Sequence, residues 1–295
     1  MSAVETGEWT GRDVHVDDVE RELAKLRGAD DQLRTSVLTH IAWIPPEWIE
    51  PARAAFAGLG ERYPSRTILL LAAPEEPNGL DARVSMQCFP AGGGNHVCTE
   101  VVELQLRGSR AEAPSSVVAP LLLPDLPVFL RWRGRPSFGD PTFERLAALV
   151  DRFVVDSREW ADLHAAYGNL AAHFSPRLAV SDIVWARTLP WRAALASQWP
   201  AVAEIRDLRV TGPEADALLL AGWLRSRLKR AITLQQEPAA EVEAVAFDST
   251  QVPVPEEPPP GPSELLSAEL DRFGRDVVYE DAVRQAAVEH VAHAR

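Results

Sequence analysis

The chain has 295 residues, 46% hydrophobic and 25% charged, the proportions of a folded globular protein, and it is long enough for two domains. Its formal net charge of −13 repels phosphate backbones and no basic patch interrupts it, so we expect no nucleic-acid partner. The first residues lack the pattern of a secretory signal, and no stretch approaches the roughly 20 apolar residues of a membrane helix. We therefore expect a cytoplasmic protein without a membrane partner.

The first predicted element is a helix over residues 16–27. Val19, Leu23 and Leu26 recur at intervals of three and four residues, which places them on one helix face. We predict that residues 1–33 form a helical N-terminal extension.

The next segment has the pattern of a strand–helix–strand unit. Residues 34–44 are rich in β-branched and aromatic residues, and Pro45-Pro46 ends this predicted strand. A helix follows and is predicted to end at Gly60. Residues 66–73 are almost continuously apolar, as in a strand covered on both faces. The unit predicts a sheet with parallel pairing.

Two longer strands are predicted over residues 81–89 and 96–106. The glycine cluster Gly92-Gly93-Gly94 lies between them, which favours an antiparallel hairpin. The remaining elements of a predicted α/β domain over residues 34–180 are a helix at 115–123, a strand at 127–132, a helix at 143–150, a strand at 153–155 and a helix at 160–174.

Residues 181–295 are predicted to form a smaller α+β domain. Ser181 or Asp182 can cap its first helix. Residues 236–262 are rich in proline and glutamate and predict a loop or partly ordered ribbon with one strand at 242–247. The other predicted elements are a strand at 208–211, a helix at 213–229 and helix from residue 263 onward. The fold class is therefore α/β, with a mixed sheet and βαβ units in the N-terminal domain.

Sequence devices typical of catalysis are missing. The glycine cluster lacks the Lys-Ser or Lys-Thr of a phosphate-binding loop, and the predicted βαβ turn carries Pro45-Pro46 instead of a G-x-G-x-x-G motif. No G-x-S-x-G nucleophile motif occurs. We therefore expect a protein that is not an enzyme and holds no cofactor.

Cys88, His96 and Cys98 are the only group with metal-ligand character along the hairpin. Their spacing matches no common zinc motif, so we expect no metal. The two thiols could meet across the hairpin as a redox pair, but buried free cysteines that act as small hydrophobes are the favoured interpretation.

Tryptophan beside arginine is the most unusual feature of the composition. The chain holds 9 Trp and only 3 Tyr. Each Trp alone is best explained as core filling under an arginine lid, whereas together they indicate a recognition surface for a protein, or else a site for an anionic sugar phosphate. The candidate interface residues are Arg131, Trp132, Arg133, Trp185, Arg187, Trp191 and Arg192.

Long segments of the chain resemble the glucose-6-phosphate dehydrogenase assembly protein family (OpcA). They are RTSVLTHIAWIPPEW, YPSRTILL, PLLLPDLPVFLRWRG, VDRFVVDSREW and SDIVWARTLPWR, and the resemblance resumes in LLLAGWL and SELLSAELDRFGRDVVYEDAV. It implies a non-catalytic protein that binds glucose-6-phosphate dehydrogenase and acts as an assembly factor or allosteric activator. Such a protein would support the oxidative pentose phosphate pathway and the supply of NADPH.

Two alternatives stay open at this point. One is an enzyme, or former enzyme, of α/β fold that binds a sugar phosphate or nucleotide. The other is a thiol redox sensor that uses Cys88 and Cys98. The sequence makes no prediction about self-association.

Overall fold

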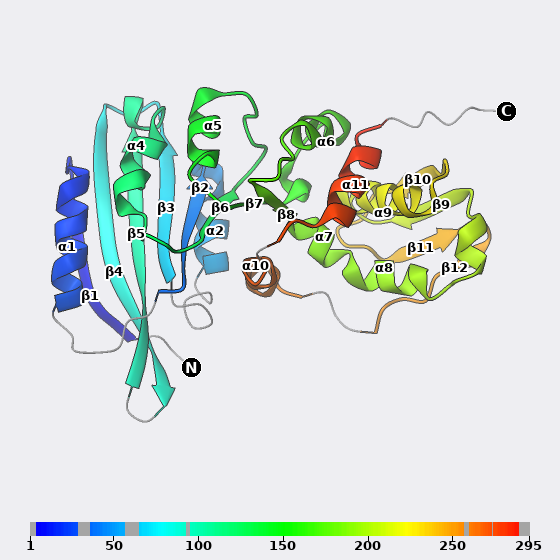
Figure 1. The fold of residues 1–295 in the computed structure, drawn as a ribbon, viewed down its shortest axis with the longest axis horizontal. Helices are drawn as coiled ribbons and strands as arrows, with labels where there is room; N and C mark the ends of the chain where they lie inside the picture. The colour runs from blue at the N-terminus through cyan, green and yellow to red at the C-terminus, as the bar shows by residue number, and fades with distance from the viewer. Residues whose placement is uncertain are drawn as a thin grey trace. The chain divides into compact units, whose positions relative to one another are not determined.

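The structure is a computed structural model that describes residues 4–28, 36–56, 65–92, 95–256, 260–272 and 274–288. It divides into two compact units, Met1–Val154 and Val155–Arg295, each with its own core (Figure 1). The predicted α/β class is confirmed, because both units combine helices with mixed sheets.

The first unit is built on a mixed sheet, to which it contributes strands in the order β1-β4-β5-β3-β2-β6-β7. These strands are β1 (Val4–Gly11), β2 (Leu38–Ile44), β3 (Ser65–Ala73), β4 (Gly79–Gly92), β5 (Asn95–Arg107), β6 (Val128–Trp132) and β7 (Arg152–Val155). Its α-helices are α1 (Val16–Gly28), α2 (Ile49–Phe56), α4 (Pro114–Val118) and α5 (Pro141–Ala147), with 3₁₀ turns at Pro46–Trp48, Gly108–Arg110 and Ala119–Leu121.

The predicted βαβ unit is confirmed. Strands β2 and β3 pair in parallel, α2 connects them, and β6 pairs in parallel on the other side of β2. Ala52 of α2 packs against Ala42, Ile44 and Leu69, so the helix covers the sheet with small and branched apolar side chains. The predicted helix end at Gly60 lies outside the described residues.

The predicted hairpin is also confirmed, with β4 and β5 antiparallel along their whole length. Its turn residues Gly93 and Gly94 lie outside the described residues. Strand β1 pairs antiparallel with β4 in a range where only a helix was predicted. The local sequence does not reveal β1, because it is an edge strand whose partner, β4, lies far away along the chain.

The prediction that the two cysteines remain free thiols is wrong. Cys88 and Cys98 lie directly opposite each other on β4 and β5, with their Cα atoms 4.1 Å apart, and a disulfide joins them. Opposite residues of an antiparallel pair point to the same face, so the hairpin brings the two sulfur atoms together. The bond is buried beside Met86 and Leu26.

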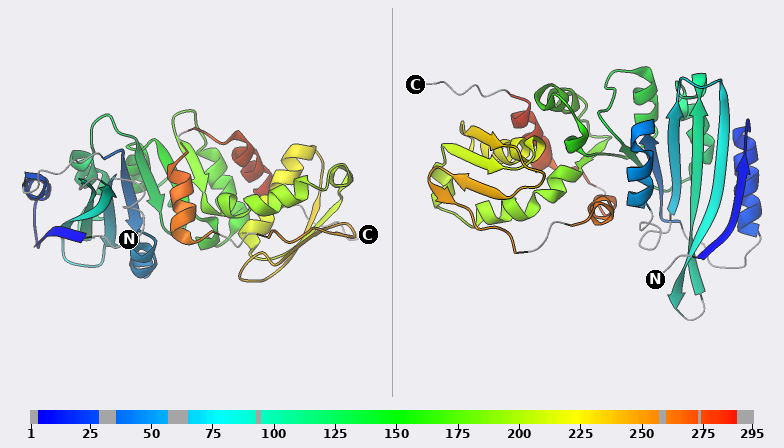
Figure 2. Two further views of the ribbon diagram at one scale, coloured as in Figure 1. Left: turned by 90° about the horizontal axis from the view of Figure 1, so that it is seen from below. Right: turned by 180° about the vertical axis from the view of Figure 1, so that it is seen from behind.

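The second unit contains a four-stranded sheet in the order β10-β9-β11-β12. The strands of this unit are β8 (Ala179–Asp182), β9 (Asp207–Thr211), β10 (Thr233–Glu237), β11 (Ala244–Phe247) and β12 (Thr250–Gln251). Its helices are α6 (Leu163–Ala172), α7 (Ile183–Arg187), α8 (Leu189–Ala196), α9 (Glu214–Leu228), α10 (Pro262–Leu270) and α11 (Val277–Ala286), with 3₁₀ turns at Ser157–Glu159 and Ala201–Glu204. Figure 2 shows this arrangement from two further sides.

The proline- and glutamate-rich segment is more ordered than predicted. The expected strand at 242–247 is present as β11, and β12 follows it as a short antiparallel partner. Strand β10 begins just before the segment and pairs in parallel with β9. The ribbon is held because Val245, Phe247 and Val252 lie in the hydrophobic core of the second unit.

Helix α9 is buried on almost all sides, including Leu219, Leu220 and Ala221, and it packs against α11. Gly222 makes the close approach possible, because a Cβ atom at this position would lie 2.3 Å from the carbonyl oxygen of Ala282. None of the described helices combines the length and the apolar character needed to cross a membrane.

We predict opposite effects for two glycine-to-alanine substitutions in helices. Gly222→Ala should destabilise the fold by about 1–3 kcal/mol or more, because its Cβ meets backbone of α11. Gly168→Ala in α6 should stabilise it by about 0.5–1 kcal/mol, because its Cβ meets nothing within 4 Å and alanine favours the helix. Urea unfolding of the two variants measures both effects, and equal effects would contradict the α9–α11 packing.

We also predict that reduction of the disulfide lowers the free energy of unfolding by about 2–3 kcal/mol, the value for a crosslink that closes a loop of about ten residues. Denatured, unreduced protein should show no free thiol, and two thiols after reduction. The variant Cys88→Ala/Cys98→Ala should unfold identically with and without reductant. Two thiols in unreduced protein would contradict the crosslink.

Candidate functional site

The candidate residues of the first unit lie on and just after β6. Arg131 and Trp132 are buried, at 1% and 4% exposure. Trp132 stacks on Trp43 with ring centroids 5.0 Å apart and meets Phe143 edge-on at 5.1 Å. The Arg133 guanidinium lies 4.5 Å from the centre of the Trp48 ring. These contacts make the segment part of the sheet's packing, with Arg133 half-buried at its edge.

Burial, with a smaller contribution from Arg131, keeps His40 uncharged on the same sheet face. Arg131 pairs with Ala42 on β2, and His40 is two residues earlier on that strand. Burial, together with the charge of Arg131, lowers the pKa of His40 to about 3, so the imidazole is neutral at physiological pH. A neutral histidine beside a buried guanidinium avoids a second buried positive charge.

The four candidates of the second unit lie on α7 and α8 and come close together. The Arg192 guanidinium lies 3.4 Å from the centre of the Trp185 ring and donates to the Trp185 carbonyl oxygen at 2.7 Å. Trp185 itself donates its indole N–H to Asp276 at 2.8 Å. Burial lowers the pKa of Arg192 to about 10. Trp185 is 3% exposed, so the predicted arginine lid over a buried tryptophan is present here.

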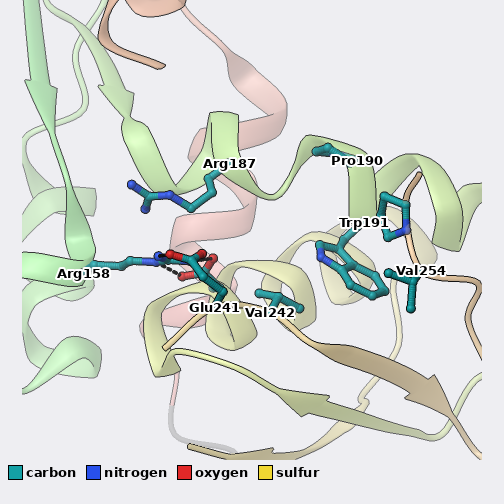
Figure 3. A pocket seen from close by; sticks show the side chains of 9 residues that line it. Arg158, Arg187, Pro190, Trp191, Glu241, Val242 and Val254 are labelled. Atoms are coloured by element: carbon teal, nitrogen blue, oxygen red, sulfur yellow. Dashed lines mark hydrogen bonds and ion pairs between the residues drawn. The ribbon is translucent and has the colours of Figure 1, made fainter. Parts of the chain in front are cut away.

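Trp191 and Arg187 line a small pocket of about 100 Å³ in the second unit (Figure 3). The pocket has a polar end at Arg187 and an apolar end at Val254. Its lining residues are Arg158, Arg187, Pro190, Trp191, Asp216, Glu241, Val242, Val254 and Pro255. Helices α7, α8 and α9 therefore contribute to one site together with the ribbon around β11.

Arg158 is the centre of the polar end. Its guanidinium donates to both oxygens of Asp216, at 2.7 and 2.8 Å, and to both oxygens of Glu241, at 2.9 Å each. Burial alone would lower the pKa of Arg158, but these hydrogen bonds raise it overall. The same bonds lower the pKa of Glu241. Arg158 thus binds two carboxylates, whose negative charges offset that of the guanidinium, so it attracts an anionic ligand only weakly.

Arg187 completes the polar end from α7. Its Nη2 donates to Asp156 at 3.4 Å, and its Nη1 is buried without a hydrogen-bond acceptor. Sequence reasoning selected Arg187 but missed Arg158, Asp216 and Glu241. Asp216 and Glu241 lie 58 and 83 positions from Arg158, and no local pattern links the three.

A buried carboxyl group lies next to this site, at the start of α7. Asp182 accepts hydrogen bonds from the backbone N–H groups of Ser157 and Val184, at 3.1 and 2.9 Å. It therefore caps α7, as predicted. Burial raises the pKa of Asp182 to about 7, and the Asp156 carboxylate adds to the shift.

The pocket places paired charges beside apolar side chains and presents no histidine, serine or cysteine in its lining. Within the described part of the chain, no group of three or more His, Cys, Asp or Glu residues is placed to hold a metal ion. Whether the predicted interface residues contact a partner stays a prediction.

Two family models match the chain. One, described as the N-terminal domain of the glucose-6-phosphate dehydrogenase subunit, matches residues 57–172. The other, described as the C-terminal domain of the same subunit, matches residues 178–258. Together they cover about two thirds of the chain. The chain belongs to the OpcA family.

Curated OpcA proteins from cyanobacteria are similar to more than half of this chain. An OxPP cycle protein OpcA from Synechocystis sp. is 28% identical over 56% of this chain, and one from Nostoc punctiforme is 29% identical over 60%. The protein of that name from Synechococcus elongatus is 29% identical over 58%. The matched region spans only 37–41% of the length of these OpcA relatives.

We predict that Asp182→Asn changes the pH dependence of stability of this OpcA-family chain. Between pH of about 4 and 7 the folded state holds a proton on Asp182 that the unfolded state has released. Stability of the wild type therefore falls with rising pH in this window, by about 1 kcal/mol per pH unit. The amide oxygen of asparagine preserves both cap bonds and carries no charge. The variant should gain stability over the wild type from pH 4 to 7 and keep that gain above pH 7.

Urea unfolding at pH 4, 5, 6, 7 and 8 measures this difference. Asp207→Asn makes the same substitution at an exposed position in the same unit and is the matched control for the change itself. Parallel curves for Asp182→Asn and the wild type would show that Asp182 is already ionised throughout the window.

Proposed function

We propose that this chain is a non-catalytic assembly factor or allosteric activator of glucose-6-phosphate dehydrogenase. The observation that carries the proposal is the pair of family models, both named for a subunit of that dehydrogenase. In this role the protein acts in the cytoplasm and supports the oxidative pentose phosphate pathway and the supply of NADPH.

Activation by a binding partner requires unequal affinity for two states of the enzyme. A protein that binds the active form of the dehydrogenase better shifts the population toward that form, whereas equal binding changes nothing. A hundredfold preference corresponds to about 2.7 kcal/mol, which an interface of standard size supplies. No chemical step by this chain is needed.

The site geometry supports binding over catalysis on a sugar phosphate. The pocket's Arg158 is engaged by Asp216 and Glu241, so a phosphate would have to displace two carboxylates from it. Among the sequence-predicted residues, Arg133, Arg187 and Arg192 are partly exposed and stay candidates for direct partner contact. Trp132, Trp185 and Trp191 are buried and would act by shaping the surface.

The purified chain should co-elute with the cognate dehydrogenase and change its kcat or its KM for glucose 6-phosphate. The measurement is size-exclusion chromatography with light scattering, followed by steady-state kinetics at saturating partner. No complex and unchanged kinetics would refute the proposal. Thermal shift with sugar phosphates and NADP is the parallel control, because a ligand at 100 times its Kd adds about 2.7 kcal/mol, and we expect none.

A further inference from the structure

Helix α8 has one buried face and one bare face. Trp191 and Leu195 point into the core of the second unit, at 6% and 0% exposure. Leu189, Ala193 and Ala196 are exposed, and their spacing of four and three residues places them on the opposite face. The exposed positions themselves are apolar, and the partly buried Arg192, which stacks over Trp185, flanks them.

Trp199 extends the bare face beyond the helix. It is 66% exposed, the largest value among the large hydrophobic residues described, and its backbone N–H donates to Ala196 at 3.2 Å. Val254 is 63% exposed and lines the pocket together with Pro190 and Trp191, next to the start of α8 (Figure 3). We call Leu189, Ala193, Ala196, Trp199 and Val254 the α8 surface. Isolated exposed apolar residues are normal, but an exposed tryptophan that directly follows an apolar helix face indicates an interaction site.

The ribbon beside the α8 surface is acidic. Residues 236–262 contain six Asp and Glu residues and no Lys, Arg or His. Exposed carboxylates on this stretch include Glu241, Glu243 and Glu256. Glu241, Val242 and Val254 share the pocket lining with Pro190 and Trp191, so the ribbon lies beside the first turn of α8. The apolar face therefore has a negatively charged border.

We propose that the α8 surface is where this chain docks on its partner dehydrogenase. The matching surface is an apolar recess that receives Trp199 and the bare face of α8, bordered by Lys and Arg side chains that face the acidic ribbon. Burial of the tryptophan supplies affinity, and the opposite charges steer the encounter and set the orientation. The inference rests on the proposed function and assigns the surface that performs it.

A second copy of this chain is a poor occupant of the same surface. The chain carries a net charge of −13, and a twofold contact would place each acidic ribbon beside the other copy's α8 surface. Like charges brought together at an interface border oppose association. The acidic ribbon therefore favours a partner surface that carries Lys and Arg over a second copy of this chain.

The test is the affinity of purified variants for the purified dehydrogenase, measured by biolayer interferometry. Trp199→Ala and Ala193→Glu should each weaken binding at least about tenfold, since one removes the anchor and the other adds bulk and charge to the bare face. Ala165→Glu, an equivalent change on the exposed face of α6, is the matched control and should bind within twofold of the wild type. Unchanged melting temperatures establish that the variants are folded.

Charge reversal tests the border separately. Glu243→Lys/Glu256→Lys should slow association several-fold and reduce its dependence on salt. Glu20→Lys/Glu47→Lys makes the same charge change in the first unit and should leave association closer to the wild-type rate.

The outcomes separate the two proposals. If the wild type binds and both Trp199→Ala and Ala193→Glu bind equally well, the α8 surface is wrong and the proposed function stands. If the wild type forms no complex, both fall. If the wild type is a dimer that Ala193→Glu converts to a monomer, the surface joins two copies of this chain and the assigned partner is wrong.

Discussion

The second unit depends on a single arginine that joins three distant segments. Arg158 leaves the 3₁₀ turn at Ser157–Glu159 and binds Asp216 on α9 and Glu241 on the ribbon before β11. Asp216 is fully buried, so without its partner it would be an uncompensated charge in a medium of low polarity. The same guanidinium also binds Glu241, which adds to the core contacts of Val245, Phe247 and Val252 that hold the ribbon. Asp216 and Glu241 thereby meet at the polar end of the pocket.

Few of the charged groups beside the ion pairs of Arg158 with Asp216 and Glu241 are left without a stabilising neighbour. Asp182 is buried and caps α7, and burial raises its pKa to about 7, so the carboxyl group carries a proton over a wider pH range than an exposed one. Tyr167 donates its hydroxyl to Ser157 at 2.8 Å, which ties α6 to the same turn. The Trp185–Arg192 stack shields another guanidinium over an aromatic ring. Recognition surfaces built on such a network are rigid, which lowers the entropic cost of binding.

Local patterns predicted much of the secondary structure. Apolar residues at helical spacing and continuous apolar segments predicted α1, the β2–α2–β3 unit and α9. These elements bury a face whose apolar residues can be recognised in the local sequence. β1 and β10 were missed because their hydrogen bonds go to strands distant in sequence, and β12 was missed because it is only two residues long. The spacing of the two cysteines could not decide between free thiols and a disulfide. A disulfide depends on the strand register, which is fixed by pairing along the whole hairpin.

The candidate site was predicted only in part, for the same physical reason. The sequence by itself determined the α/β class, the family and the segments where tryptophan and arginine concentrate, since these are properties of composition and local order. The sequence also contains the acidic segment that follows Arg230, but a function can be inferred for it only once its position in the fold is known. Only the tertiary structure decided that Trp185 and Trp191 are buried while Trp199 is exposed. Burial is set by what packs against a side chain, and those neighbours come from segments far away along the chain.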